Sequence, residues 1–347
     1  MVSLVNDFPR VHLGHTPTPL ELLHNVSAEF GTNVWVKRDD CTGLAFGGNK
    51  TRQLDFYIGQ AIHQGADTLL TTGAVQSNHV RTTVAAARKL GLEVEVQLEH
   101  RVDREQPEYH KSGNPYLVRL MGAHINYYPV GEDEDGADKA LEVRAAELSK
   151  QGRKPFVIPL SNAHTPYGAM GYVEGAEELL AQLNAMNIDP VRFIVPTGSA
   201  STHSGFLLGM RASGCDIPVH GVCVRRDGVS QQQRVAKKLK SVIDAIGCDI
   251  SIPDEDIICD DSQLAPGYGL PNDDTIAAIK HMARSEGILL DPTYSGKTFA
   301  VLLDMLHRGD FGADQHVVFL HTGGAVSLFG YPELVEDEHD NSTLKGY

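Results

Sequence analysis

Hydrophobic and polar residues follow two patterns along the chain, one typical of strands and one typical of helices. Segments with the two patterns alternate. Short runs rich in β-branched residues are typical of strands buried in parallel sheets. We expect such strands at Val34–Lys37, Thr68–Thr72, Glu93–Leu98, Ile125–Tyr128, Phe156–Pro159, Arg192–Pro196, Val219–Val224 and Val317–His321. Helical periodicity predicts helices between them, at Lys50–Gln64, Ser77–Leu90, Ala137–Gln151, Val173–Asn187, Ser230–Ile246, Asp273–Ser285 and Lys297–His307. This alternation predicts βαβ units and an α/β fold of open, twisted parallel sheets.

Some segments and histidines fall outside this pattern. The polar, breaker-rich stretch from Arg101 to Asn114 is predicted to be a surface loop, and the acidic run Asp254–Asp261 a solvated edge. The sequence assigns no partner to His110, His220 or His281. It also lacks the HExxH spacing of a zinc site, so we expect no metal.

Length and charge restrict the class of protein. The 347 residues suggest two domains or one large α/β domain, and the net charge of −15 is unsuited to nucleic acid or anionic lipid. The first ten residues contain charges and a proline where a secretory leader needs an apolar run, and no stretch is long enough to span a membrane. The five cysteines include no CxxC pair, which is typical of free thiols in a reducing compartment. We therefore expect a soluble cytoplasmic protein.

Four turns near predicted strand ends are rich in glycine, serine, threonine and asparagine: Gly47–Lys50, Gly73–His79, Thr197–Thr202 and His321–Gly324. In open α/β sheets, ligands bind beyond the carboxyl ends of the strands, so the four turns together predict one shared pocket. Any one of them alone is equally well explained as an ordinary connection.

The turn Thr197–Thr202 follows a predicted strand and precedes an apolar helical run from Gly205. Free amides at a helix start, together with hydroxyl side chains, suit a phosphate dianion without any lysine. The turn matches neither the GxxxxGK[ST] of a P-loop nor the GxGxxG of a dinucleotide site. It therefore predicts a phosphate carried by a molecule smaller than a nucleoside triphosphate or NAD.

Lys50 follows Gly47, Gly48 and Asn49 at the start of a predicted helix. The positive end of the helix dipole disfavours the charged amine, and burial of the side chain acts in the same direction. A neutral lysine amine is a nucleophile that can form a Schiff base. Taken alone, a lysine in this position is more often an ordinary surface residue.

Longer motifs over nearly the whole chain, from about Thr16 to Tyr331, resemble the 1-aminocyclopropane-1-carboxylate deaminase/D-cysteine desulfhydrase family of pyridoxal-phosphate enzymes. The resemblance rests on Val36–Gly43, Phe46–Arg52, Gly65–Leu69, Gln76–Arg81, Ala265–Asn272, Gly287–Lys297 and His321–Ala325. It implies the fold of the tryptophan synthase β-subunit class (fold type II), with pyridoxal 5'-phosphate between two domains. The large domain would comprise residues 1–50 and 161–347, the small inserted domain residues 51–160. The resemblance also implies a homodimer.

The resemblance implies a role for each matching residue in the cofactor site. Lys50 corresponds to the lysine that forms the Schiff base with the cofactor, and Asn78 to the asparagine that bonds its phenolic oxygen. The phosphate loop corresponds to Ser199–Thr202, which agrees with the independent interpretation of that turn. The expected cofactor site also includes Asn49, Ser199, Ala200, Ser201, Thr202, Ser295 and Thr322.

The substrate site is implied in the same way. Ser77, with the amides of Asn78 and His79, corresponds to the site of the substrate carboxylate. Tyr268 and Tyr294 correspond to two active-site tyrosines near the substrate. Packing in the core is the alternative explanation for both tyrosines.

Two positions separate the branches of the family. Ring-opening deaminases have glutamate and leucine where this chain has Ser295 and Thr322, and the desulfhydrase branch has hydroxyl residues there. With a hydroxyl instead of a carboxylate beside its ring nitrogen, the cofactor is a weaker electron sink. A weaker sink is sufficient for loss of a β-substituent. The resemblance thus implies α,β-elimination of a small amino acid, D-cysteine, to pyruvate, ammonia and hydrogen sulfide. Alternatives are a lyase for cysteate or chloroalanine, a ring-opening deaminase, and a non-catalytic pyridoxal-phosphate-binding protein.

The chain departs from the family pattern at three places. Gln53 replaces a lysine that supports the cofactor phosphate, and Ala200 replaces the central glycine of the phosphate loop. The segment Leu160–Gly168 replaces a shorter Gly-Gly-Ser-Asn loop. If this segment borders the substrate, His164 or Tyr167 contacts it; the alternative is a surface insertion.

Overall fold

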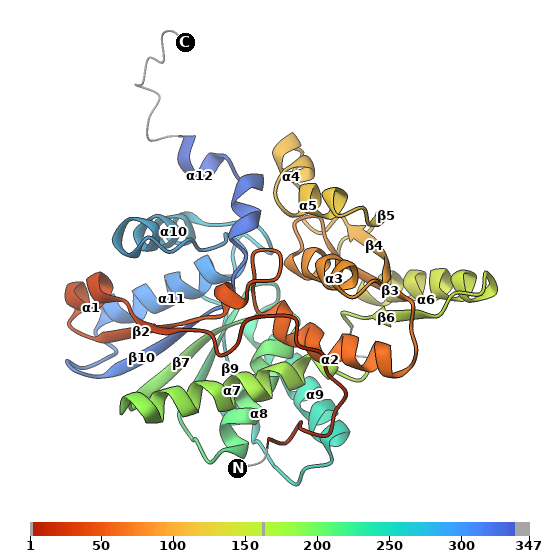
Figure 1. The fold of residues 1–347 in the computed structure, drawn as a ribbon. Coiled ribbons are helices and arrows are strands. Elements are labelled where there is room, and N and C mark those ends of the chain that lie inside the picture. Colours follow the sequence, from red (N-terminus) through yellow and green to blue (C-terminus); the bar gives the residue numbers. More distant parts are fainter. Residues whose placement is uncertain (1–2, 162–163, 337–347) are drawn as a thin grey trace, which may run out of the picture.

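The computed structural model describes residues 3–161 and 164–336 and contains two sheets (Figure 1). The six-stranded sheet has the order β1-β2-β10-β7-β8-β9, and the four-stranded sheet the order β5-β4-β3-β6. Every pairing between these strands is parallel except that of β1 with β2. The strands are β1 Leu20–Leu22, β2 Asn33–Arg38, β3 Thr68–Ala74, β4 Glu93–Glu99, β5 His124–Tyr128, β6 Pro155–Ile158, β7 Pro190–Thr197, β8 Val219–Cys223, β9 Ile258–Asp260 and β10 His316–His321. The predicted α/β class is confirmed.

Helices cover both faces of the six-stranded sheet, with α7 and α8 on one side and α10 and α11 on the other (Figure 1). Successive residues of β10 alternate between the two cores: Val318 and Leu320 pack with α7 and α8, Val317 and Phe319 with α10 and α11. The α-helices are α1 His24–Phe30, α2 Lys50–His63, α3 Asn78–Lys89, α4 Pro107–Lys111, α5 Asn114–Leu120, α6 Glu134–Lys150, α7 Tyr167–Met186, α8 Ser201–Ala212, α9 Gly228–Ile246, α10 Asp273–Glu286, α11 Ser295–Arg308 and α12 Glu333–Glu336. Within the described part of the chain, no helix is long and apolar enough to cross a membrane.

The helices α7 and α8 pack closely against each other, and this contact holds the start of α8 in place. A Cβ added at Gly205 would lie 2.0 Å from the carbonyl oxygen of Ala169, so only glycine permits this contact. The four-stranded sheet is built from residues 68–158. The division into domains at residues 50 and 160 stays a prediction.

The eight predicted strands and seven predicted helices are present, with ends shifted by a few residues. The prediction of a surface loop over Arg101–Asn114 is wrong, because α4 lies within it and Tyr109 and Asn114 are fully buried. The segment contains no long apolar run, so its burial depends on contacts with distant parts of the chain. Strand β1, only three residues long, was also missed.

The acidic run Asp254–Asp261 is more than a solvated edge, since it contains β9, which pairs with β8. The structure also supplies partners for the three unassigned histidines. The ring of His220 lies 2.9 Å from the carboxylate of Asp260 and that of His281 3.2 Å from the carboxylate of Glu29. His110 contacts the carbonyl oxygen of Arg104 at 2.6 Å.

Candidate active site

A cavity lies where the carboxyl ends of strands from both sheets meet. Residues of the first three predicted turns line it, together with Arg101, Glu134, Arg225, Tyr268 and Tyr294. The fourth turn, His321–Gly324, lies behind the first one, where the amide of Asn49 donates to the carbonyl oxygen of Thr322 at 3.0 Å. The predicted shared pocket therefore exists, with three turns in its wall and the fourth supporting them.

Lys50 is the first residue of α2, and its amine lies in the cavity and donates to Oε1 of Gln53 at 3.2 Å. Burial lowers the pKa of this amine to about 8. The two preceding glycines are required by the backbone: Gly47 has φ +66°, and a Cβ there would lie 2.1 Å from the carbonyl oxygen of Asp40. Gly48 has φ +116° and faces the carbonyl oxygen of Thr322. The turn thus holds a readily deprotonated amine inside the cavity.

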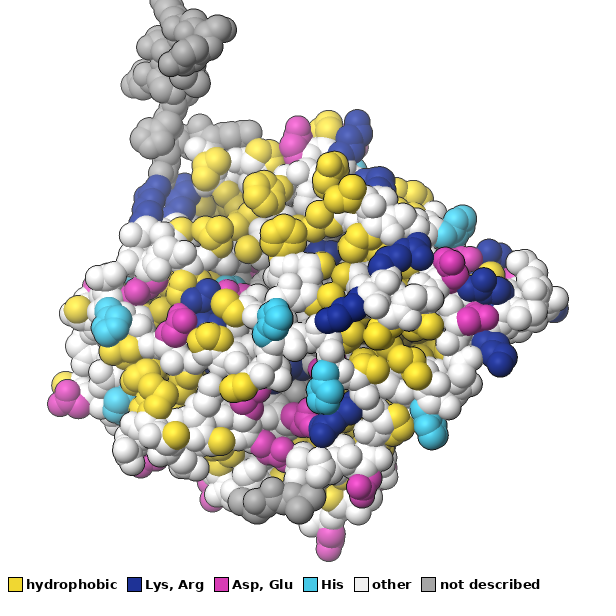
Figure 2. Space-filling model, in the orientation of Figure 1, with side chains coloured by type: hydrophobic (Ala, Val, Ile, Leu, Met, Phe, Trp, Pro, Cys, Tyr) yellow, Lys and Arg dark blue, Asp and Glu magenta, His cyan; other side chains and the backbone are white. Residues whose placement is uncertain are grey.

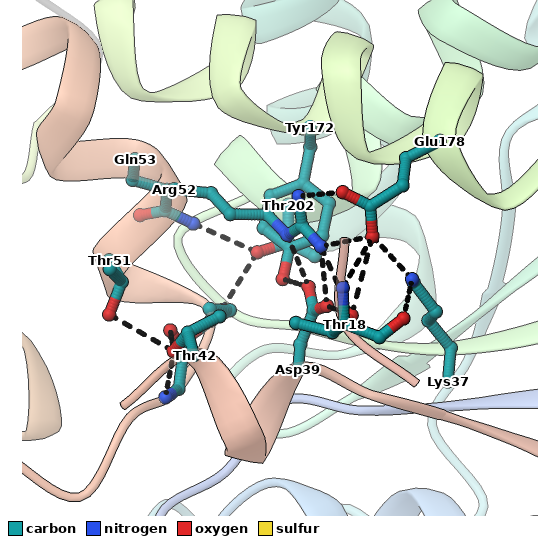
Figure 3. A network of polar contacts seen from close by, with 12 residues as sticks. Thr18, Lys37, Asp39, Thr42, Thr51, Arg52, Gln53, Tyr172, Glu178 and Thr202 are labelled. Carbon is teal, nitrogen blue, oxygen red and sulfur yellow. Dashed lines mark hydrogen bonds and ion pairs between the residues drawn. The ribbon is translucent and has the colours of Figure 1, made fainter. Parts of the chain in front are cut away.

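The hydroxyl of Thr202 is oriented by two amides. Nδ2 of Asn49 and Nε2 of Gln53 both donate to Oγ1 of Thr202 at 2.9 Å; Figure 3 shows the Gln53 contact. Because both acceptor positions of the hydroxyl are occupied, its proton is left to donate to a ligand. Gln53, which stands where the family has a lysine, thus orients a donor instead of supplying a charge.

Within the phosphate-loop candidate Ser199–Thr202, Ala200 has φ +73°, in the left-handed region. Glycine adopts this conformation without strain, whereas alanine pays a strain of roughly 1 kcal/mol. The loop therefore holds Ala200 in a backbone conformation that favours glycine. It places Ser199, Thr202 and the free first-turn amides of α8 at the cavity. No carboxylate lies in this loop, so the donor set suits an anion.

The start of α3 presents a second set of donors. Ser77 caps the helix, with its Oγ accepting from the amide of Val80 at 3.2 Å. The side-chain oxygen of Asn78 accepts from Nη1 of Arg81 at 2.9 Å and from Nδ2 of Asn114 at 3.0 Å. Asn78 is not among the described residues that line the cavity, so its predicted contact with the cofactor stays a prediction. Arg81 also donates to the carbonyl oxygen of Gly47 at 2.8 Å, which ties α3 to the Lys50 turn.

Two tyrosines form the opposite side of the cavity. The hydroxyl oxygens of Tyr268 and Tyr294 are 2.5 Å apart, and burial raises the pKa of Tyr294 well above its usual value. The loop carrying Tyr268 is held by Lys297, whose amine donates to the carbonyl oxygens of Leu264 at 2.7 Å and Gly267 at 3.1 Å. The tyrosines are therefore a fixed, hydrogen-bonded pair and not merely core packing.

Other predicted site residues lie outside the cavity lining. Ser295 is buried and exchanges hydrogen bonds with Asp291, donating to Oδ1 at 2.6 Å and accepting from its amide at 2.8 Å. Ser201 and Thr322 are also buried behind the wall. The ring of His164 lies 3.5 Å from the carboxylate of Glu142, and the neighbouring residues 162–163 fall outside the described residues. The roles assigned to these residues stay predictions.

Sequence reasoning missed four polar residues of the lining: Arg101, Glu134, His203 and Arg225. Arg225 lies two residues beyond the carboxyl end of β8, which is a signal that could have been used. Arg101 lies in the stretch interpreted as a surface loop, and Glu134 begins a helix whose acidic first turn is common in any helix.

Comparison with known proteins identifies the family. The family model described as pyridoxal-phosphate dependent enzyme matches residues 11–323. The chain belongs to this family.

Its relatives include two bacterial D-cysteine desulfhydrases. The one from Salmonella paratyphi C (strain RKS4594) is 40% identical over 324 residues, which cover 93% of this chain and 96% of that protein. The one from Yersinia pestis (strain Pestoides F) is 40% identical over 327 residues, covering 94% and 97%. Among solved structures, an ACC deaminase homologue has a TM-score of 0.84 at 34% identity and covers 96% of this chain and 97% of its own.

The cavity fits pyridoxal 5'-phosphate. Lys50 would supply an amine that can react with its aldehyde. Ser199, Thr202 and the first amides of α8 would hold the phosphate. When bound, the cofactor supplies an electron sink for carbanion chemistry at the substrate Cα.

Proposed function

We propose that the protein catalyses α,β-elimination of D-cysteine to pyruvate, ammonia and hydrogen sulfide. The observation that carries the proposal is the Lys50 amine, with its lowered pKa, in one cavity with the capped start of α3 and the Tyr268–Tyr294 pair. The desulfhydrase relatives over almost the full chain support the same reaction.

Different residues of the chain have different roles in this reaction. The first amides of α3, next to Ser77, hold the substrate carboxylate at the positive end of the helix. Lys50, when neutral, accepts the Cα proton, because a pKa lowered to about 8 gives this amine a larger neutral fraction near neutral pH than an ordinary lysine has. The tyrosine pair faces the β-substituent and donates a proton to the departing sulfur. Burial of these groups excludes water from the reacting atoms.

The proposal extends to the assembly and location of the protein. Hydrophobic side chains gather over the part of the surface where α4 and α5 lie (Figure 2). Phe46, Tyr116, Leu289 and Phe329 are more than half exposed and line one groove. An apolar groove of this kind supports the homodimer that the family resemblance implies. The same resemblance and the free cysteines support a cytoplasmic location.

The rate of cofactor uptake by the apoprotein is expected to depend on pH through Lys50. Only the neutral amine attacks the aldehyde, so the rate should rise with pH up to about 8 and level off above that value. An unperturbed lysine, with a pKa near ~10.4, would let the rate rise further. Stopped-flow absorbance from pH 6 to 10 measures this profile. The same measurement with a free primary amine in place of the protein serves as the reference. A rise continuing to pH 10 contradicts the lowered pKa.

A product assay tests the proposed reaction. The purified holoenzyme is supplied with D- and L-cysteine, 3-chloroalanine, cysteate and 1-aminocyclopropane-1-carboxylate, and the keto acid and leaving group are measured. We expect pyruvate with stoichiometric sulfide from D-cysteine. Release of 2-oxobutyrate from the cyclopropane substrate without pyruvate from cysteine would identify a ring-opening deaminase instead. Absence of any keto acid would identify a non-catalytic binding protein.

A further inference from the structure

The carboxylate of Glu134 joins the parts of the chain that carry the two sheets, and it has no role in the proposed reaction so far. Glu134 is the first residue of α6, which packs on the four-stranded sheet. Its partners belong to the part that carries the six-stranded sheet, where Arg225 and Arg226 follow β8 and Arg234 lies in α9. Because Glu134 lines the active-site cavity, the two parts are joined at the cavity itself.

Three guanidinium groups converge on this one carboxylate. Oε1 of Glu134 accepts from Nη1 of Arg225 and, at 2.9 Å, from Nη2 of Arg226, and Oε2 lies 3.0 Å from Nη1 of Arg234. The side chain of Glu134 is 13% exposed, and those of Arg225 and Arg234 are 6% and 12% exposed, so water screens these charges little. Burial alone would raise the pKa of Glu134, but the arginines bring it down to about 2, which keeps the carboxylate charged.

Two of these arginines reach separate segments of the cavity wall. The Cζ atom of Arg225 lies 5.9 Å from the centre of the Tyr268 ring, so the guanidinium lies against that ring. Nη1 of Arg226 donates to the carbonyl oxygen of Gly198 at 3.2 Å, in the turn that holds the phosphate-loop candidate. Tyr268 and Gly198 both line the cavity. Glu134 therefore acts on each of these segments through one guanidinium.

The third arginine contacts the connection between the two sheets. Nη2 of Arg234 donates to the carbonyl oxygen of Leu160 at 3.0 Å. Leu160 lines the cavity and follows β6, the last strand of the four-stranded sheet in chain order. All three arginines thus hold segments of the wall, and Glu134 is the carboxylate that all three contact.

We propose that Glu134 is a positioning residue of the active site, whose carboxylate holds the three arginines together and thereby sets the placement of Tyr268 and of the phosphate loop relative to α6. This inference rests on the proposed elimination and adds a residue to it. Without the shared negative charge, the three guanidinium groups repel one another at close range. The wall segments that they hold then move apart, and the groups that act on the substrate lose their mutual placement.

Loss of Glu134 should affect kcat more than KM. The substrate carboxylate is placed at the start of α3, on a different segment of the wall, so KM should change only a few-fold. The kcat depends on the placement of Tyr268 opposite Lys50 and should fall ~10- to 100-fold, because small misplacements of reacting groups are costly.

The test compares Glu134→Ala and Glu134→Gln with the matched control Glu132→Gln. Glu132 also accepts from Arg225, at 2.8 Å, but its side chain is 63% exposed and it does not line the cavity. We expect both Glu134 variants to lose kcat with D-cysteine and the control to keep the parent value, because an exposed ion pair contributes little. Glu134→Gln keeps the shape of the side chain and one acceptor oxygen, so it separates the charge from packing.

Acetate serves as a replacement for the deleted carboxylate. Supplied to Glu134→Ala at constant ionic strength, it should restore kcat several-fold, because the three arginines are left with room for a small anion. Acetamide, which has nearly the same shape without the charge, should not restore kcat. Equal recovery with acetamide, no recovery with acetate, or an equal loss of kcat in Glu132→Gln overturns the positioning role.

Hydrogen exchange on the holoenzyme, measured by mass spectrometry, tests the coupling without turnover. In Glu134→Ala, amides of the segment 197–202 should exchange on the order of 10-fold faster than in the parent, and in Glu132→Gln at the parent rate. Unchanged exchange of this segment in Glu134→Ala overturns the coupling. Since this measurement needs no substrate, and pyruvate release from 3-chloroalanine by the parent tests the elimination separately, failure of the proposed function is distinguishable from failure of the positioning role.

Discussion

Replacement of Lys50 with alanine is expected to abolish turnover, with a loss on the order of 10⁴-fold or more. The variant lacks the only lysine amine in the described lining of the cavity and thus both the cofactor attachment point and the acceptor of the Cα proton. The visible absorbance of bound cofactor should also disappear after gel filtration, because the phosphate cradle alone holds the cofactor without a covalent bond. Pyruvate release and the absorbance spectrum measure the two effects.

Lys238→Met is the matched control for this experiment. Lys238 is also buried, at 3% exposure, and burial lowers its pKa to about 8, but it does not line the cavity. The control should retain cofactor and turnover within a few-fold of the parent. If Lys50→Ala turned over D-cysteine at the parent rate, the assignment of the cavity as the active site would be wrong.

Replacement of Arg52 with methionine is expected to destabilise the fold by about 3–5 kcal/mol. Arg52 lies two residues beyond Lys50 and binds both oxygens of Asp39, at 2.9 Å each, and both oxygens of Glu178, at 2.8 and 2.9 Å (Figure 3). Asp39 also accepts from the hydroxyl of Tyr172 at 2.6 Å, and Lys37 pairs with Glu178. Removing the guanidinium leaves two carboxylates in the interior with one cation between them.

The same network predicts a pH dependence of stability. Burial alone would raise the pKa of Asp39 and Glu178, but their contacts with Arg52 bring both below the usual values. Their contribution to stability is therefore present above about pH 4 and is lost as the pH falls through the lowered pKa values. In Arg52→Met this acid-sensitive contribution should largely disappear.

Chemical denaturation at pH 7 and pH 3 measures the effect of Arg52→Met on the free energy of unfolding. Arg308→Met is the control, because Arg308 also contacts two carboxylates, of Asp304 and Asp310, but is about half exposed. Surface pairs of this kind contribute ~0–1 kcal/mol. A loss in Arg52→Met no greater than in Arg308→Met would show that the buried network contributes nothing beyond a surface pair.

More of the cofactor site than of the substrate site could be predicted from the sequence. Lys50 and the loop Thr197–Thr202 belong to contiguous motifs in which turn chemistry and helix start are visible in neighbouring residues. Arg101 and Arg225 could not be found this way, because each is an ordinary polar residue in its local context. They become a site only when β4 and β8 place them at one cavity.

By itself, the sequence determined the order of strands and helices and the α/β class, and it predicted that the turns at Lys50 and Thr197–Thr202 share a pocket, because periodicity and turn chemistry act between residues close in the chain. Tertiary structure alone decided which polar groups meet. Gln53 reaches Thr202 across 149 positions and Arg52 reaches Glu178 across 126, and no local pattern specifies such pairs. Burial then gives these contacts their strength, since hydrogen bonds and charges removed from water must be satisfied within the fold.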